Sequence, residues 1–288
     1  MGSSASPAPA LSSIQSNAGL QTERRPLEQT GLSYDVAGTA DAVIEAWRLV
    51  YRSYRRAGLI ASNPANLHSL PEIIGPQTMV ACGRLGTEVV STISSYTDGP
   101  TGLPLDQVYP DELTQLRRRG RRLAEIGLLA DRRENPSRTL NSLFDLMRFG
   151  VLYDIHCGMD DTVIGVHPRH APFYQRMIGF EIAGPERSYA TVNDQLVVLL
   201  RLDLRTTPYQ SRLPRGLKYF MDNRIPPEAF DQRFTFAEPA LVNSDIGRFR
   251  AWSDDHRRLA REKSAEPDSL NRADVSEDRH ASRPPVAA

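Results

Sequence analysis

The chain has 288 residues, of which 40% are hydrophobic and 24% charged, and its 35 basic residues balance 35 acidic ones. This balance excludes a global field that would select nucleic acid or a membrane as partner. Two cysteines, Cys82 and Cys157, exclude a disulfide framework and a cysteine-based zinc site. The sequence has no run of 18 apolar residues and no signal-peptide pattern at its start. We therefore expect a soluble, cytoplasmic protein without an integral membrane segment.

Composition divides the chain into four parts. Residues 1–28 are rich in Ser, Ala, Pro and Gln, which predicts a disordered tail. Residues 29–205 carry the periodic patterns of one domain. Residues 206–260 are an irregular extension that we expect to pack on this domain. Residues 261–288 mix charges with Ser, Ala and Pro, which predicts a second disordered tail.

Hydrophobic periodicity predicts strands and helices in the domain. In chain order they are a strand at 32–36, a helix at 40–57, a short helix, a hairpin of strands at 78–84 and 88–96, a helix at 106–120, a strand at 122–130, a helix at 140–153, a strand at 162–166, a helix at 168–178, a strand from Phe180 and a strand at 196–204. In the first long helix, apolar residues recur at a spacing of three and four. This spacing directs Trp47 and Tyr51 toward the core.

The segment from Thr162 to Leu204 is the most specific part of the chain. Pro168 presets a helix start, Phe173-Tyr174 is followed after four residues by Gly179-Phe180, and a strand of Val and Leu closes the segment. This arrangement resembles the end of the Gcn5-related N-acyltransferase fold. The longer string from His167 resembles the bacterial N-acyl amino acid synthases, which are related to the acyl-homoserine lactone synthases. The resemblance implies an α/β (α+β) fold, with a central mixed, mostly antiparallel sheet flanked by helices and splayed fourth and fifth strands.

The resemblance also implies catalytic residues. The fourth predicted strand matches the strand of the synthases that carries a glutamate, so Glu125 is expected to be the general base that takes the amine proton through water. The alternative is a partly exposed carboxylate paired with Arg121 or Arg122. Tyr174 is expected to be the general acid at the departing sulfur. Its alternative is a packing tyrosine between helix and sheet.

The thioester is expected to lie in the gap between the splayed strands, against backbone amides. Enzymes of this fold that use acetyl-CoA follow the fourth strand with a glycine-rich loop that holds the pyrophosphate, but residues 131–140 contain no glycine. Arginines after the strand are expected to contact a single phosphate instead. The predicted thioester-binding and pantetheine-binding residues are Ile126, Gly127, Leu128, Arg132, Arg133 and Arg138.

The basic run from Arg117 to Arg122 offers a surface for an acidic acyl carrier protein. The alternative is a solvated helix end, and nucleic acid is disfavoured because no aromatic residues interleave with these arginines. His167, Trp47 and Tyr51 are expected to position the substrate. No metal site is expected, because no carboxylate or cysteine completes a ligand set with His167 and His170. No cofactor is expected beyond the thioester co-substrate.

Together these observations predict an N-acyltransferase. It would move a long-chain fatty acyl group from a thioester of acyl carrier protein, or of CoA, to the amine of an amino acid or a similar small molecule. One alternative is an N-acetyltransferase that depends on acetyl-CoA. The other is a binding module for acyl thioesters or carrier proteins without catalytic activity.

Overall fold

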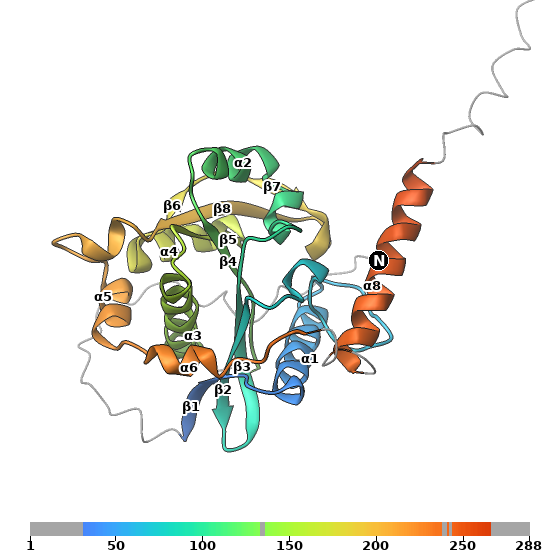
Figure 1. The fold of residues 1–288 in the computed structure, drawn as a ribbon, viewed down its shortest axis with the longest axis horizontal. Coiled ribbons are helices and arrows are strands. Elements are labelled where there is room, and N and C mark those ends of the chain that lie inside the picture. The colour runs from blue at the N-terminus through green and yellow to red at the C-terminus, as the bar shows by residue number, and fades with distance from the viewer. Residues whose placement is uncertain (1–30, 133–135, 238–240, 242–243, 266–288) are drawn as a thin grey trace, which may run out of the picture. The chain divides into compact units, whose positions relative to one another are not determined.

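The protein consists of one mixed sheet with helices on both faces (Figure 1). The computed structural model describes residues 31–132, 136–237, 241 and 244–265. The strands are β1 (Leu32–Val36), β2 (Thr78–Leu85), β3 (Glu88–Thr97), β4 (Leu123–Asp131), β5 (Asp161–Val166), β6 (Glu181–Ile182), β7 (Arg187–Tyr189) and β8 (Gln195–Asp203). The α-helices are α1 (Ala40–Arg56), α2 (Pro110–Arg118), α3 (Pro136–His156), α4 (Ala171–Ile178), α5 (Arg215–Asp222), α6 (Pro227–Asp231) and α8 (Asp245–Ala265).

The sheet has the order β1-β2-β3-β4-β5-β8-β6, and β7 pairs with β8. Neighbouring strands are antiparallel except β4 and β5, which are parallel. The predicted fold class is thereby confirmed. The parallel pair is the feature that positions the candidate site.

The predicted helix at 106–120 is divided in two. A 3-10 helix, η3 (Pro104–Gln107), precedes α2, and Tyr109 between them has φ −125° and ψ 49°, outside the helical region. The ring of Pro110 disfavours a helical conformation at the residue before it. The prediction of one continuous helix was therefore wrong, and η3 is free to turn toward the sheet.

Alternation along β3 shows which helix covers each face of the sheet. The indole N–H of Trp47 in α1 donates to Ser94 Oγ at 3.3 Å, whereas the next residue, Ser95, donates to Asp154 in α3. Successive side chains of a strand point to opposite faces. The helix α1 therefore covers one face and α3 the other, and Tyr96 points to the α1 face with Ser94.

The C-terminal extension passes around the edge of the sheet. The helix α5 contacts α3 and α4, and α6 contacts β1. The N–H of Phe234 then donates to Ala37 O at 2.8 Å, and the Phe236 ring stacks on Trp47 at 5.4 Å. The extension thus contacts helices on the α3 side, passes beside β1 and reaches Trp47 of α1.

The compact body of the chain ends at Arg250, and residues 251–288 form a separate unit. Residues 251–265 continue α8, so helix extends into the segment predicted as a C-terminal tail. The predicted N-terminal tail, 1–28, and the rest of the C-terminal tail lie outside the described residues. Among the helices that the structure describes, none is long and apolar enough to cross a membrane.

Candidate active site

The strands β4 and β5 form a fork. They pair at only three positions, Leu123 with Asp161, Ala124 with Thr162 and Glu125 with Val163. Beyond Glu125 the described parts of the two strands separate, and Gly165 on β5 is exposed. The two arms therefore diverge beyond the last paired position, and Glu125 marks the point where the gap between them begins.

A β-bulge shapes the β4 arm of this fork. On β3, Thr92 pairs with Ala130 and Ser94 with Gly127, so three steps along β4 match two steps along β3. Leu128 within the bulge has φ 52°, a value that non-glycine residues seldom adopt. Because a bulge locally interrupts the ladder, it re-aims backbone N–H groups on the arm that faces the gap.

Glu125 is buried between neutral donors. Its side chain is 5% exposed, its Oε1 accepts from the Tyr96 hydroxyl at 2.9 Å, and its Oε2 accepts from the Leu105 N–H at 3.0 Å. Burial raises the pKa of Glu125 to about 8, and the two hydrogen bonds oppose that rise. Its partners are a phenol and an amide instead of Arg121 or Arg122. The alternative of an exposed, ion-paired carboxylate was therefore wrong.

Two glycines leave room for Tyr96 and Leu105, the residues that donate hydrogen bonds to Glu125. A Cβ atom on Gly127 would lie 2.8 Å from Tyr96 Oη, and one on Gly165 would lie 2.7 Å from Leu105 Cδ2. Both glycines stand two residues beyond the last paired position, one on each arm of the fork. A larger residue at position 127 would collide with the hydroxyl that bonds to Glu125, and one at position 165 would displace the Leu105 side chain, whose residue donates its backbone N–H to Glu125.

Arg117 holds η3 in place over the site. Its guanidinium donates to both carboxylate oxygens of Asp106 at 2.6 and 2.7 Å, and to Asp98 at 2.5 Å. Asp106 in turn accepts from the Leu103 N–H at 2.8 Å. Because Leu105 lies between Leu103 and Asp106, these bonds fix the amide that donates to Glu125.

Tyr174 lies on α4 and is 8% exposed. Its ring packs nearly perpendicular to those of Phe173 and Phe180, at 5.4 and 6.1 Å. Burial raises the pKa of Tyr174 well above the ordinary range, and the nearby Tyr54 adds to this rise. The ring thus has the packing expected of the structural alternative, while its hydroxyl belongs to a polar aromatic cluster.

That cluster contains residues that the sequence analysis did not select for the site. Burial raises the pKa of Tyr96, and Glu125 and Tyr54 raise it further. Tyr54 on α1 thus adds to the raised pKa of both Tyr96 and Tyr174, and its ring lies 5.3 Å from that of His68. Two features of the sequence could have indicated these residues. One is the polar run Ser94-Ser95-Tyr96 inside a predicted strand, and the other is Tyr54, one helical turn after Tyr51.

The predicted thioester-binding residues divide into two groups. Ile126, Gly127 and Leu128 lie on the β4 arm directly after Glu125. Arg132 is exposed and forms an ion pair with Glu88, while Arg133 and the side chain of Arg138 lie outside the described residues. The helix α3 begins at Pro136, shortly after β4 ends. The N–H groups of its first turn therefore come next along the chain after the β4 arm of the fork.

The predicted substrate-positioning residues are not brought together. Trp47 is fully buried between Ser94 and Phe236, and Tyr51 is 9% exposed, so both belong to the core on the α1 face. His167 follows the last residue of β5 and is half-buried. Its Nδ1 accepts from the Arg169 N–H at 3.3 Å, and burial and Arg169 lower its pKa. Of the three, only His167 stands on an arm of the fork.

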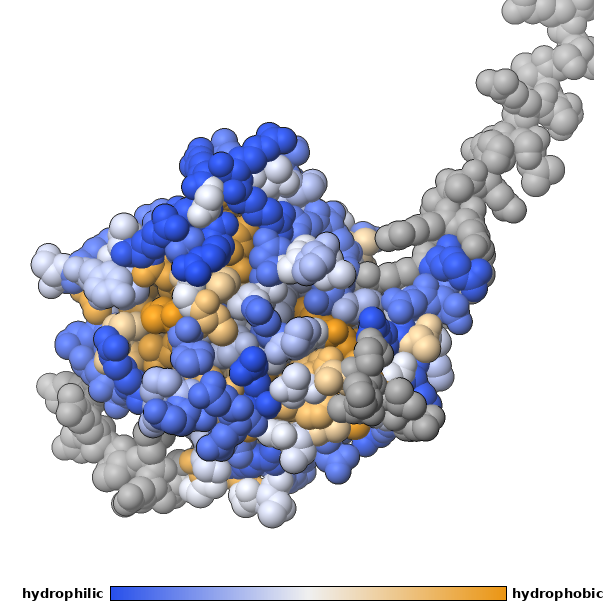
Figure 2. Space-filling model, in the orientation of Figure 1, coloured by the Kyte–Doolittle hydropathy of each residue, from blue (hydrophilic) through white to orange (hydrophobic). Residues whose placement is uncertain are grey.

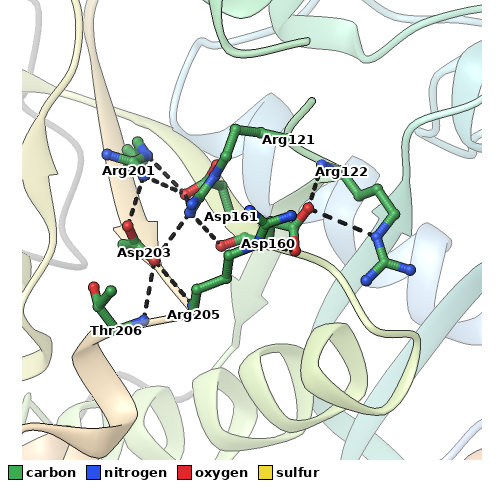
Figure 3. A network of polar contacts seen from close by, with 8 residues as sticks. All are labelled: Arg121, Arg122, Asp160, Asp161, Arg201, Asp203, Arg205 and Thr206. Atoms are coloured by element: carbon green, nitrogen blue, oxygen red, sulfur yellow. Dashed lines mark hydrogen bonds and ion pairs between the residues drawn. The ribbon is translucent and has the colours of Figure 1, made fainter. Parts of the chain in front are cut away.

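The basic run lies at the closed end of the fork, where it forms ion pairs (Figure 3). Arg121 donates to Asp161 at 2.6 Å and contacts Asp203 at 2.9 Å, and Arg201 contacts both of these carboxylates. Asp160 accepts from Arg205 at 2.6 Å and from the Arg122 N–H at 2.7 Å. These bonds join β4, β5 and β8.

This network shows that part of the basic run has partners within the protein. Arg117, Arg121 and Arg122 form ion pairs there, and Arg118, Arg119 and Arg122 are exposed, so a surface for a carrier protein stays a prediction. In Figure 2, α2 forms a strongly hydrophilic cap, and apolar surface appears below it on the same face. The run serves mainly to hold the closed end of the fork.

The sequence matches the family model described as "N-acyl amino acid synthase FeeM" over residues 45–203. This range contains both strands of the fork, Glu125 and Tyr174. The chain belongs to the FeeM family. As a member of this family of synthases it is an acyltransferase enzyme, and the alternative of a non-catalytic binding module was wrong.

The chain is similar to solved structures, of which FeeM supports the fold. The structure of FeeM, an N-acyl amino acid synthase from uncultured soil microbes, is 24% identical, covers 62% of this chain and 95% of its own, and has a TM-score of 0.53. BjaI, a CoA-dependent acyl-homoserine lactone synthase, is 15% identical, with coverages of 66% and 88% and a TM-score of 0.47. No curated protein sequence matches the chain.

Proposed function

We propose that this enzyme transfers a long-chain fatty acyl group from a thioester to the amine of an amino acid or a similar small molecule. The proposal depends on one observation above all: the buried Glu125 lies where β4 and β5 separate, in a chain of the FeeM family. A carboxylate at this point can reach both the gap and the α1 face. It is therefore suited to receive a proton from an amine that approaches a thioester in the gap.

In the proposed reaction the amine nitrogen attacks the thioester carbonyl carbon. Glu125 accepts the amine proton through a water molecule, the carbon–sulfur bond breaks, and the departing sulfur takes up a proton. Backbone N–H groups of Ile126 to Leu128, which lack strand partners on the gap side among the described residues, would hold the carbonyl oxygen. The bulge on β4 supports this role, because it re-aims these groups.

Tyr174 would contribute a hydrogen bond to the sulfur. Its raised pKa makes it a weak proton donor, because proton transfer is most efficient when the pKa of the donor lies near the working pH. A neutral hydroxyl can still stabilise the developing thiolate. We therefore assign Tyr174 a supporting role and Glu125 the main proton transfer.

The donor would be acyl carrier protein or acyl-CoA. The absence of glycine from residues 131–140 argues against a tight pyrophosphate cradle and favours the single phosphate of a carrier protein arm. The N-terminus of α3 could receive that phosphate, since helix N-terminal amides bind anions. Arg118 and Arg119 remain exposed for contact with an acidic carrier.

The test is a donor and acceptor screen. Purified protein is incubated with palmitoyl acyl carrier protein, palmitoyl-CoA or acetyl-CoA, each with a pool of the twenty amino acids, and N-acyl products are read by mass spectrometry. Glu125→Gln is run beside the wild type. We expect an N-palmitoyl amino acid from a long-chain donor, and we expect the substitution to reduce it strongly.

The three donors separate the possible outcomes. Product from the carrier protein alone would establish the donor, and the mass of the product would identify the acceptor. Product from palmitoyl-CoA at equal rate would support the long-chain reaction but overturn the preference for a carrier. Acetylated product from acetyl-CoA alone would replace the proposal with an N-acetyltransferase.

A further inference from the structure

A second buried carboxylate, Asp154 on α3, lies on the opposite face of the sheet from Glu125. It is fully buried and accepts hydrogen bonds from Ser95 Oγ on β3 and from Thr162 Oγ1 on β5, the latter at 2.5 Å. Burial raises the pKa of Asp154 to about 7, and the two hydroxyl donors oppose this rise. The proposed transfer reaction does not use this carboxylate, so its cost of burial needs another explanation.

The two donors of Asp154 stand directly next to the neighbours of Glu125. Ser95 precedes Tyr96, and Tyr96 is paired with Glu125 in the β3–β4 register. Thr162 precedes Val163, which is paired with Glu125 in the β4–β5 register. Successive residues of a strand point to opposite faces of the sheet. Asp154 therefore bonds, from the α3 face, to the two strands whose residues lie beside Glu125 on the α1 face.

The strand between these two hydroxyls leaves room for the carboxylate. Ala124 on β4 is paired with Thr162 and points to the α3 face, because Glu125 beside it points to the other. Its side chain is a single methyl group and is fully buried. One carboxylate can therefore bond to β3 and β5 at once across β4.

We propose that Asp154 is a positioning residue for acyl transfer, which fixes β3 and β5 at the closed end of the fork and thereby holds the Tyr96 hydroxyl on Glu125. Its effect on rate depends on the proposed function. Its effect on the carboxyl group of Glu125 does not. The two effects can be measured separately.

The same helix offers a matched control. Asp145 is 2% exposed, accepts from the Tyr219 hydroxyl of α5 at 2.8 Å, and lies 3.3 Å from Arg148. It thus ties α3 to the C-terminal extension instead of to the strands of the fork. Asp145→Ala removes a buried, hydrogen-bonded carboxylate of α3 without touching β3 or β5.

The experiment follows the titration of Glu125 by NMR. Protein is labelled with glutamate carrying carbon-13 at the carboxyl position, and the Glu125 signal is assigned by its loss in Glu125→Gln. Titrations are compared for the wild type, Asp154→Ala, Asp154→Asn and Asp145→Ala. Both Asp154 variants remove the same negative charge. Any difference between their Glu125 midpoints therefore reports a change in the position of the groups that bond to Glu125.

We expect the Glu125 midpoint to be higher in Asp154→Ala than in Asp154→Asn, because the hydrogen bond from Tyr96 favours the ionised carboxylate. The asparagine oxygen still accepts one hydroxyl and should restore most of the wild-type behaviour. With a productive donor, Asp154→Ala should lower kcat about tenfold with little change in KM. Asp145→Ala should leave both the midpoint and kcat unchanged.

Equal Glu125 midpoints in folded Asp154→Ala and Asp154→Asn proteins would overturn the proposal and leave Asp154 a purely structural residue. If Asp154→Ala does not fold, Thr162→Val, which removes one hydroxyl and keeps the side-chain shape, is titrated in its place against the same control. If the wild type transfers no acyl group, the proposed function fails, but the midpoints still decide whether Asp154 positions Tyr96.

Discussion

Buried carboxylates at the two ends of the fork behave in opposite ways. Glu125 is 5% exposed and Asp160 at the closed end is 3% exposed, so burial acts on both to raise the pKa. Bonds from Arg205 and Arg122 outweigh burial at Asp160, and its pKa is lowered. At Glu125, whose donors are neutral, the pKa rises to about 8. The charge of the hydrogen-bond donors, more than the depth of burial, therefore decides whether the pKa of a buried carboxyl group is raised or lowered.

The strongest test of this comparison removes the proton acceptor. Glu125→Gln should lower the rate of acyl transfer by about 10²–10⁴-fold, the usual contribution of a general base. The shape is kept, so the variant should remain folded by circular dichroism. Glu112→Gln on α2, which alters an ion pair with Arg187 on β7, is the control and should retain the wild-type rate. An active Glu125→Gln would exclude Glu125 as the base.

At the closed end, the same kind of change should affect stability. Asp161 is fully buried and contacts Arg121 and Arg201. Asp161→Asn removes the more deeply buried of the two carboxylates that these cations share and leaves them only Asp203, so it should lower the free energy of unfolding by about 1–3 kcal/mol. Urea denaturation measures this directly. A loss below about 1 kcal/mol would mean that the network is no stronger than a surface ion pair.

The two ends should also differ in how stability responds to pH. Because the pKa of Glu125 is raised on folding, its contribution to stability is complete below its ordinary pKa and is lost as the pH rises through about 8. The pKa values of Asp160 and Asp203 are lowered, despite burial, by their arginine partners, so their contribution is present above the ordinary range and is lost in acid.

Thermal or urea unfolding across this range checks the sign. From pH 5 to pH 8 the stability of Glu125→Gln relative to wild type should increase, by at most about 1.4 kcal/mol for each pH unit. A relative stability that stays constant would show that Glu125 titrates normally. The rate of acyl transfer should rise over the same range as Glu125 becomes ionised.

A smaller effect is expected from the donor on β3. Tyr96→Phe removes the hydroxyl that opposes the raised pKa of Glu125, so the rise of rate with pH should move to higher pH. At pH 7 we expect a loss of about three- to tenfold, which corresponds to the net free energy of one ordinary hydrogen bond. The complete pH–rate profile distinguishes this from a simple loss of activity, which would leave the midpoint in place.

The smallest effect is expected from Tyr174→Phe. The ring packing against Phe173 and Phe180 is preserved, so only a hydrogen bond to the sulfur is lost. We expect a reduction of about fivefold in kcat, equivalent to about 1 kcal/mol. A loss above a hundredfold would restore Tyr174 as a full general acid, and no loss would leave it a packing residue.

The sequence by itself predicted the order of the main elements and, through the family resemblance, the fold, and it placed Glu125 on the fourth predicted strand. Periodicity and turn residues are local properties, so the strand that contains Glu125 and the helix that buries Trp47 could be predicted from their own segments. The short strand β7 and the break before Pro110 were missed, because three residues or a single angle leave little periodic signal.

Only the tertiary structure decided what surrounds Glu125. Its donors come from β3 and from η3, and their positions depend on the strand register, the bulge and Arg117. The same holds for the basic run, whose arginines meet aspartates that lie far away along the chain. Residue type identifies a charge, but only the fold decides whether that charge faces a counterion, a neutral donor or water, and this environment determines its chemistry.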